Sequence, residues 1–596
     1  MFLPGAAKRF GDVVFCCVLL PAIFGMTGSS SAQTKAHSND TLASGAYEHG
    51  LIAAQNGNLT AARSDFEQAV KLRPGDAEYQ NALAQVMLQQ GDIDAAISHF
   101  RTVTSLAPDA ALPHAELGKA LAAKGSLDEA VAELSEAVKL APQQPEVHRQ
   151  LARVLSLQGK AGDAIAEMKA ALALAPGQPV LHDDLGVLLA QQSQFADAEK
   201  EFRGALALDS NYQPALFHLG VALLRSGDND GAVPLLTQAS KGNPKDGLAF
   251  YYLGTALEAK HDTSGALQAY RQAAQLTPHL VPLQTRLGLL LQRSGDPENA
   301  AVAFRKVVEL TPNDPEAYNN LGLALMQHGE GPAAVKEFQH ALKLRPDDAA
   351  FRGNLAVTLL QQSDFDAAAE QLQEALKLAP GNASLHYNLA LALKLKDNLP
   401  GAIAEFQQAI QLDPQLADAY YSLGVTLWQK GDFPAAAEQL QQALKIKPDY
   451  AEAYYTLGTV LKQMDKLPEA AEALRAAIRL QPDFMGAHTT LAAVLRQMGD
   501  AAGADAEKRI GEQLSKQKTS LQAATFATNS GSRLLNAGDL DGAISQFRNA
   551  VQLAPSYALA HQQLAIALLR KGQATEAQEE FKKASELDPR LKPSAR

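Results

Sequence analysis

Hydrophobic residues recur at helical spacing in two short segments of every 34 residues along most of the chain. In residues 315–348 the first segment carries Leu321 and Leu325, and the second carries Phe338 and Leu342. Residues three or four apart lie on one face of an α-helix, so each unit predicts two helices. One helix pair of this size cannot bury its apolar face alone, and consecutive pairs must therefore stack on one another. The pattern predicts an all-α protein.

Turn residues separate the two segments of each unit. Gly329 stands where the first helix of this unit should end, a position suited to a left-handed C-cap. Pro346 stops the second helix because it has no N–H to donate. A Gly or Ala after a leucine in the first helix, and an alanine in the second, should let the two helix axes approach closely.

The 34-residue period is kept over most of the chain. Sixteen units follow one another from about residue 43 to residue 591, with one five-residue insertion. The prolines on the grid are Pro74, Pro108, Pro142, Pro176, Pro244, Pro278, Pro312, Pro346, Pro380, Pro414, Pro448 and Pro482. Only Ser210 breaks that series.

These motifs resemble the tetratricopeptide repeat family, because the unit length and the Gly, Ala, aromatic and Pro positions match together. The resemblance implies an α-solenoid, a right-handed superhelix of about sixteen helix-turn-helix units. It also implies that the first helix of each pair lines a concave groove that binds a peptide or a partner protein.

The fourteenth repeat departs from the pattern. It has neither the aromatic residue nor the proline of the grid, and the register slips by five residues. We predict an extended second helix and a loose connection over 508–532, with the insertion 519–523 acting as a hinge. The array then consists of repeats 1–14 (43–518) and repeats 15–16 (524–591), whose polar last helix forms a C-terminal cap.

The N-terminus indicates export. Lys8 and Arg9 precede an apolar run over 13–26, and small residues follow it up to Ala32. This predicts a signal peptide over residues 1–32, followed by a polar linker over 33–42. The apolar run is shorter than the roughly twenty residues of a membrane span, although an uncleaved anchor is an alternative. The expected location is periplasmic or secreted, in the cell envelope.

Composition and motifs exclude several classes of function. Of 596 residues, 53 are Lys or Arg and 65 are Asp or Glu, and no compact basic block stands out, which argues against nucleic acid and anionic lipid as partners. The two cysteines, Cys16 and Cys17, lie in the N-terminal apolar run, so a disulfide framework and a zinc–thiolate site are not expected. No catalytic or phosphate-binding motif occurs, and we predict no enzyme activity, no cofactor and no metal.

A ladder of histidines, His114, His148 and His182, suggests a metal-binding or pH-sensitive stripe. Equivalent residues of neighbouring repeats lie about 8–10 Å apart, too far to share one zinc ion, which favours a structural role.

Aromatic and cationic residues gather on the first helices of repeats 11 to 14. Residues spaced i, i+4 and i+7 share a helix face, and in repeat 12 these are Tyr421, Val425 and Trp428, the only tryptophan. The candidate residues at matching places are Tyr387, Lys394, Tyr455, Lys462 and Arg496. Such a surface can hold an extended segment by stacking and by hydrogen bonds to carboxylates. The alternative, that the tyrosines pack against neighbouring helices, stays open.

An asparagine stripe runs through repeats 9 to 11, at Asn320, Asn354 and Asn388. Amide side chains offer a donor and an acceptor, so they can pair with an extended peptide backbone whatever its sequence. The stripe is similar to the asparagine ladder in the repeat region of O-GlcNAc transferase, whose catalytic domain has no counterpart in this sequence.

Three functions compete. The first is a non-catalytic scaffold that holds a partner segment in the groove of repeats 9 to 13. The second is an assembly component of an envelope export or polysaccharide-secretion complex, acting through its convex surface or its ends. The third, an enzyme, lacks a candidate pair of titratable groups.

Overall fold

The computed structural model describes residues 32–591, and the predicted signal peptide lies outside them except for Ala32. Within that range the chain forms thirty-one α-helices and no strand. It divides into two compact units, residues 1–310 and 311–596. The prediction of an all-α solenoid is confirmed. No helix in the described part is long and apolar enough to cross a membrane.

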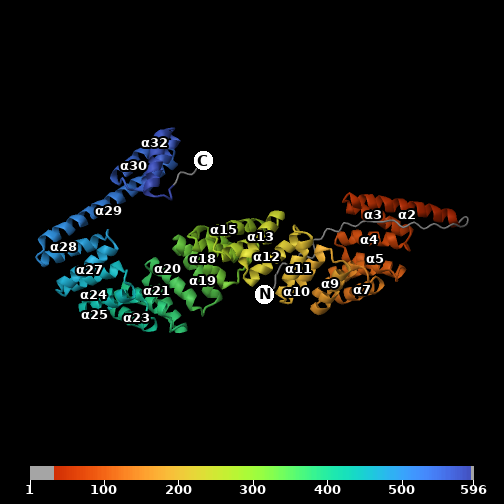
Figure 1. Ribbon diagram of the computed structural model, residues 1–596, viewed down its shortest axis with the longest axis horizontal. Helices are drawn as coiled ribbons and strands as arrows, with labels where there is room; N and C mark the ends of the chain where they lie inside the picture. The colour runs from red at the N-terminus through yellow and green to blue at the C-terminus, as the bar shows by residue number, and fades with distance from the viewer. Residues whose placement is uncertain (1–31, 592–596) are drawn as a thin grey trace. The chain divides into compact units, whose positions relative to one another are not determined.

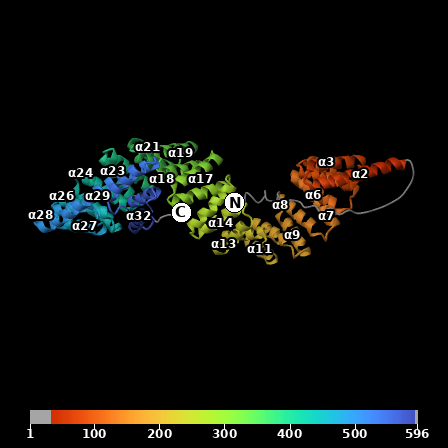
Figure 2. The ribbon, with the colours of Figure 1, turned by 90° about the horizontal axis from the view of Figure 1, so that it is seen from above.

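The first unit contains α2 to α17 (Figures 1 and 2). Its helices are α2 (Ala32–Gln55), α3 (Leu59–Leu72), α4 (Ala77–Gln89), α5 (Ile93–Leu106), α6 (Ala111–Lys124), α7 (Leu127–Leu140), α8 (Pro145–Leu157), α9 (Ala161–Leu174), α10 (Pro179–Gln191), α11 (Phe195–Leu208), α12 (Gln213–Ser226), α13 (Asn229–Gly242), α14 (Gly247–Ala259), α15 (Thr263–Leu276), α16 (Val281–Arg293) and α17 (Pro297–Leu310).

The second unit contains α18 to α32. Its helices are α18 (Pro315–His328), α19 (Gly331–Leu344), α20 (Ala349–Gln361), α21 (Phe365–Leu378), α22 (Ala383–Leu395), α23 (Leu399–Leu412), α24 (Ala417–Lys430), α25 (Phe433–Ile446), α26 (Ala451–Gln463), α27 (Leu467–Leu480), α28 (Met485–Gln497), α29 (Ala501–Asn536), α30 (Leu540–Leu553), α31 (Ala558–Arg570) and α32 (Ala574–Leu587).

Each repeat is a pair of packed helices. Up to repeat 14 an even-numbered helix is the first of its pair and the next odd-numbered helix is the second, and within a unit each pair packs against the following one. The helix α29 belongs to two repeats, because it packs against α28 of repeat 14 and against α30 of repeat 15. The chain thus forms the sixteen pairs that the 34-residue period predicts.

A residue in the left-handed conformation follows the first helix of every repeat. Gly329 has φ 88° and caps α18 as predicted. Ten further glycines take the same conformation at equivalent places. In five repeats the residue is not glycine, and φ is still about 60°, at Ser193, His261, Ser363, Asp397 and Asp465. The fold therefore imposes this conformation even where the side chain disfavours it.

Small residues set the distance between the two helices of a pair. A Cβ atom added at Gly424 on α24 would lie 2.8 Å from Cγ of Leu440 and 3.2 Å from the carbonyl oxygen of Ala436, both on α25. Ala436 itself is fully buried. The two helices are therefore packed with no room for larger side chains at these positions.

We expect Ala436→Leu to lower the free energy of unfolding by about 1–3 kcal/mol, because the larger side chain overpacks the contact between α24 and α25. Urea denaturation followed by circular dichroism measures the change. Ala404→Leu, at an exposed position of α23, is the control and should change little. Equal stability of the two variants would contradict this account of the packing.

Two predicted boundaries are wrong. The polar linker over 33–42 is part of α2, which runs over 24 residues. Its residues include no proline, and continuing the helix satisfies their backbone hydrogen bonds.

The loose connection predicted within 508–532 is not there either, since α29 is one helix of 36 residues. The extension of the second helix was predicted correctly. The predicted break after this extension is wrong. The segment has no proline, so the helix continues into the first helix of repeat 15. The five inserted residues lengthen this shared helix (Figure 1).

Candidate groove site

The candidate residues of repeats 11 to 14 lie on the first helices α22, α24, α26 and α28. These helices belong to one unit, and the repeats that carry them pack against one another in chain order. Every candidate tyrosine, and Trp428 between them, is half-buried. The surface is thus partly open to a ligand and partly used for packing.

The tyrosines pack against aromatic residues of the array. The ring centroid of Tyr421 lies 4.9 Å from that of Tyr450, and that of Tyr455 lies 4.8 Å from that of Phe484. Tyr387 packs less closely on the second helix of its own repeat. The tyrosines thus pack against neighbouring residues, which was the alternative drawn from the sequence, and contact with a ligand stays a prediction.

Tyr450 and Phe484 were missed by the sequence reasoning. Each stands just before the first helix of the following repeat, and the two are 34 residues apart, which is a signal that could have found them. The ammonium of Lys447 lies 4.4 Å from the Tyr450 ring centroid. Burial, followed by the nearby Asp418 carboxylate, raises the pKa of Tyr450, so its hydroxyl stays protonated.

The asparagine stripe is not a row of equivalent amides. Nδ2 of Asn354 donates to Oδ1 of Asn319 at 2.9 Å, so the middle amide already uses a donor between repeats 9 and 10. Asn319, next to the predicted Asn320, is buried. Asn320 and Asn388 are half-buried and make no side-chain hydrogen bond within residues 32–591. Only these two have their full hydrogen-bonding capacity left for a ligand.

Four residues at one position of consecutive first helices form what we call the Lys-Trp row. It consists of Lys394, Trp428, Lys462 and Arg496. Lys394 is half-buried, and burial lowers the pKa of its ammonium. Neither Lys394 nor Lys462 has an ion-pair partner in the described part of the chain. Arg496 pairs with Asp505 of α29 at 2.6 Å, and both side chains are exposed.

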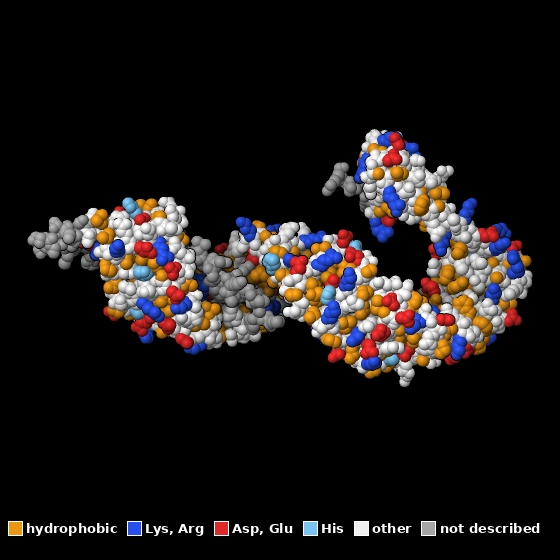
Figure 3. All heavy atoms as spheres, turned by 180° about the vertical axis from the view of Figure 1, so that it is seen from behind, with side chains coloured by type: hydrophobic (Ala, Val, Ile, Leu, Met, Phe, Trp, Pro, Cys, Tyr) orange, Lys and Arg blue, Asp and Glu red, His pale blue; other side chains and the backbone are white. Residues whose placement is uncertain are grey.

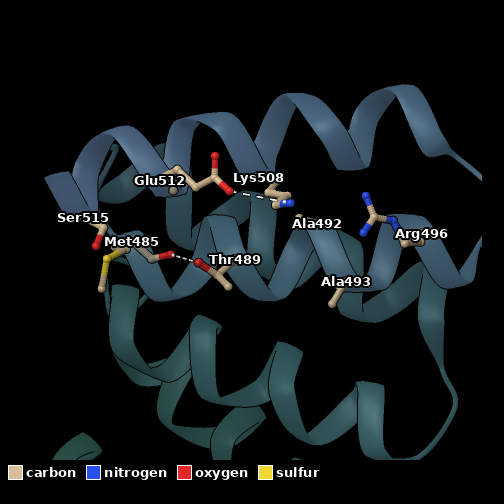
Figure 4. A pocket seen from close by; sticks show the side chains of 9 residues that line it. Met485, Thr489, Ala492, Ala493, Arg496, Lys508, Glu512 and Ser515 are labelled. Carbon is tan, nitrogen blue, oxygen red and sulfur yellow. Dashed lines mark hydrogen bonds and ion pairs between the residues drawn. The ribbon is translucent and has the colours of Figure 1, made fainter.

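A cavity of about 360 Å³ lies at the end of the row, between α28 and α29 (Figure 4). It is lined by Met485, Thr489, Ala492, Ala493, Arg496, Lys508, Gly511, Glu512 and Ser515. Lys508 pairs with Glu512 at 3.6 Å on the wall formed by α29. A Cβ atom added at Gly511 would lie 3.1 Å from Oγ1 of Thr489, so this glycine permits the close approach of the two helices.

The histidine ladder consists of separate contacts. Each histidine meets a glutamate of the second helix in its own repeat, and the Nδ1–Oε2 distances are 2.7 Å for His114–Glu133, 2.6 Å for His148–Glu167 and 2.7 Å for His182–Glu201. The same contact recurs at His386, His488 and His561, which the sequence reasoning missed because they do not stand in consecutive repeats. These contacts give the ladder a stabilising role within single repeats.

The pKa of His114 is expected to lie above its ordinary value of 6.5. Burial opposes protonation of the ring, but hydrogen bonds to Glu133 and to the carbonyl of Pro108 outweigh burial. Because the folded pKa is raised, the contact stabilises the fold fully below the unfolded pKa, and this contribution is lost as the pH rises through the folded pKa. NMR titration checks the value, with His114→Gln assigning the resonance. Glu133→Gln should lower the pKa, and a value at or below 6.5 in the unchanged protein would contradict the prediction.

Models of the tetratricopeptide repeat match most of the described chain. The matches described as "TPR repeat" cover residues 358–397, 395–431 and 428–465. Those described as "Tetratricopeptide repeat" cover residues 47–111, 184–233, 217–280 and 285–349, residues 87–154, 121–185 and 534–594, and residues 451–484. The chain belongs to the tetratricopeptide repeat family.

Solved structures share parts of the array. MamA from Desulfovibrio magneticus RS-1, residues 41 to the end, is 28% identical over 28% of this chain and 96% of its own, with a TM-score of 0.27. YrrB, described as a TPR protein with an unusual peptide-binding site, is 26% identical over 31% of this chain and 96% of its own, with a TM-score of 0.28. Yeast Tom70 is 19% identical over 73% of this chain and 96% of its own, with a TM-score of 0.33. No curated protein matches the chain.

Proposed function

We propose that this repeat scaffold is non-catalytic and holds an extended segment of a partner protein on the first-helix face of repeats 9 to 14. Membership of the family supports a role in protein binding. The Lys-Trp row supports this face as the site, because it combines cations with a partly exposed aromatic ring. We also propose, from the N-terminal sequence, that the protein acts in the cell envelope or outside the cell.

The main support for this site is that the ammonium of Lys394 is half-buried and has no ion-pair partner in the described part of the chain. A half-buried ammonium without a counter-ion is unfavourable, since it has lost part of its hydration and gained no charge partner. A carboxylate of a bound segment would offset that loss by a charge-assisted hydrogen bond. An apolar side chain of the same segment would cover the exposed part of Trp428.

The amides of Asn320 and Asn388 fit the same ligand. They stand on α18 and α22, outside the Lys-Trp row, and their donors and acceptors can pair with the backbone of an extended segment. Such pairing does not depend on the side chains of the segment. The lysines and Trp428 would then supply the preference for a particular sequence.

Affinity capture from an envelope extract tests this function. The variant Lys394→Ala, Trp428→Ala changes two residues of the row, whereas Asn354 and Tyr421 are left unchanged because they also hold the array together. The matched control Lys445→Ala removes an exposed lysine from α25, the second helix of repeat 12.

We expect the unchanged chain and the control to retain a partner at least tenfold better than the double variant, since the lost charge-assisted contact of Lys394 contributes about 1.5–3 kcal/mol. Circular dichroism must first show equal helix content. Equal capture by all three proteins would exclude this face and favour the assembly role through the convex surface or the ends.

A further inference from the structure

The side chains that should pack repeat 15 on repeat 14 are exposed. The third residue of the first helix is buried in repeats 2 to 14, as at Ala487, and again at Ala560 in repeat 16. In repeat 15 this place, counted with the five inserted residues, belongs to Phe526, which is 78% exposed. Asn529 and Arg533 share its helix side and are also exposed. We call these three residues the start face of repeat 15.

The end of repeat 14 has an uncovered surface that matches this face. It contains the cavity between α28 and α29, one wall of which is Thr489. The contact between repeats 10 and 11 shows what covers this place elsewhere, because a Cβ atom added at Gly353 would lie 3.0 Å from Cδ2 of Leu385. Thr489 holds the place of Gly353, and Phe526 holds the place of Leu385. The repeat register therefore assigns the ring of Phe526 to the cavity. We call this surface the end face of repeat 14, and it consists of Thr489, Asp505, Lys508 and Gly511.

One continuous helix keeps the two faces of a chain apart. Lys508 of the end face and Phe526 of the start face both belong to α29, and eighteen residues separate them. This is about five helical turns, so the two residues lie on the same side of α29 and about 27 Å apart along its axis. A continuous helix cannot fold back on itself. The start face of repeat 15 therefore cannot cover the end face of its own chain.

The two faces carry opposite charges at matching places. Between repeats 13 and 14 these places belong to Ala471 and Val494, which are buried in one apolar cluster. Between repeats 14 and 15 they belong to Asp505 and Arg533. Arg533 has no ion-pair partner in the described part of the chain, and Asp505 pairs with the exposed Arg496. A carboxylate has two oxygens, so Asp505 can accept from a second guanidinium.

Charge alone would not identify a partner, because acidic and basic side chains are interspersed over the face in Figure 3. The match is informative because both places are apolar and buried in the preceding contact. An exposed Asp and an exposed Arg there favour a contact between two separate surfaces, each of which is in water before they meet.

We propose that a second copy of this chain covers both faces, so that the start face of repeat 15 in each copy packs on the end face of repeat 14 in the other. In other contacts the end of a first helix pairs with the start of the preceding second helix, as Lys396 does with Asp366, so these helices run antiparallel. Two copies of α29 would lie side by side in the same way. A two-fold axis between them satisfies both contacts at once and closes the assembly as a dimer. This dimer does not depend on the Lys-Trp row or on its ligand.

Light scattering on the full chain during size-exclusion chromatography tests the dimer. We expect a mass twice the 63.4 kDa of one chain. Phe526→Ala should raise the dissociation constant of the dimer at least about tenfold, because buried aromatic residues dominate such interfaces and this one acts twice. Helix content should not change, since Phe526 is exposed in the single chain. Leu521→Ala is the matched control, because Leu521 is an exposed apolar residue on another side of α29.

A charge exchange tests the register of the two faces. It is made in a chain carrying Arg496→Gln, so that Asp505 has no competing partner. Arg533→Asp should weaken the dimer at least about tenfold, because two carboxylates then face each other. Adding Asp505→Arg to this variant should restore most of the affinity, which a merely structural role of Arg533 would not do. Arg570→Asp, the same change at an exposed arginine of α31, is the control.

Four outcomes would overturn the proposal. A mass of one chain at every concentration would leave both faces to a helix of another protein. A mass that grows beyond two chains would indicate an open chain of copies instead of a closed exchange. A dimer equally stable in Phe526→Ala would place the interface elsewhere. Failure of the exchanged charges to restore the dimer would contradict the register.

Discussion

Replacing Ser193, His261, Ser363, Asp397 and Asp465 together with glycine is expected to raise the free energy of unfolding by roughly 3–5 kcal/mol. All five residues adopt a φ of about 60°, where a Cβ atom is strained. Glycine removes that strain, and the extra entropy of the unfolded chain offsets part of the gain. The contribution of His261 should exceed those of the two aspartates, because short polar side chains tolerate this conformation better.

Urea denaturation and the melting temperature measure the effect. The five sites lie in five different repeats, so their contributions should add. Gln192→Gly and Gln362→Gly are the matched controls, since each precedes one of the five sites and has an ordinary negative φ. The controls should give no gain. A five-glycine variant no more stable than the unchanged protein would show that the local strain is compensated elsewhere.

Gln522→Pro should break α29 between repeats 14 and 15. Proline removes a hydrogen bond and clashes with the carbonyl four residues earlier, which costs about 3 kcal/mol or more in a helix interior. Gln522 is exposed, so the substitution removes no core contact. Each 1.4 kcal/mol is a factor of ten, and local opening should therefore become roughly a hundredfold more frequent.

Limited trypsin digestion reads out this opening, because Lys516 and Lys518 lie within two turns of the substituted position. In the unchanged protein both bonds should resist cleavage as helical segments do, and in the variant they should be cut much faster. Ala501→Pro is the control, since a proline at the first position of a helix needs no N–H. If trypsin cleaves the unchanged protein as fast as the variant, the result would support the hinge that was predicted from the sequence.

Most of the fold could be predicted from the period alone. Proline and glycine act locally through φ and the missing N–H, so their positions on the grid fix where helices end. The same reasoning failed in repeat 14 because it took the loss of the pattern for a loss of structure. The segment between repeats 14 and 15 has neither a proline nor a residue with positive φ, and α29 continues through it over Ala501–Asn536.

For the candidate site, the sequence predicted which residues share a helix face but not which contacts they make. The sequence placed Lys394, Trp428 and Lys462 at one helix position, and the structure places them there. It did not reveal that Asn354 bonds to Asn319, or that Tyr421 packs on Tyr450, since these contacts join different repeats. The ion pairs of Arg286 and Arg293 with Glu258 were missed for the same reason, although the two arginines lie seven residues apart on one helix face.

The sequence by itself determined the all-α class, the helix pairs, their turns and their number, because all of these follow from local backbone preferences and from one hydrophobic period. Only the tertiary structure decided which polar groups are already paired and which remain for a ligand. Hydrogen bonds and charge pairs between repeats depend on side chains about 35 residues apart, as at Asn319 and Asn354, and on the burial that surrounds them. That Lys394 has no ion-pair partner in the described part of the chain is a result of that packing, and no local pattern encodes it.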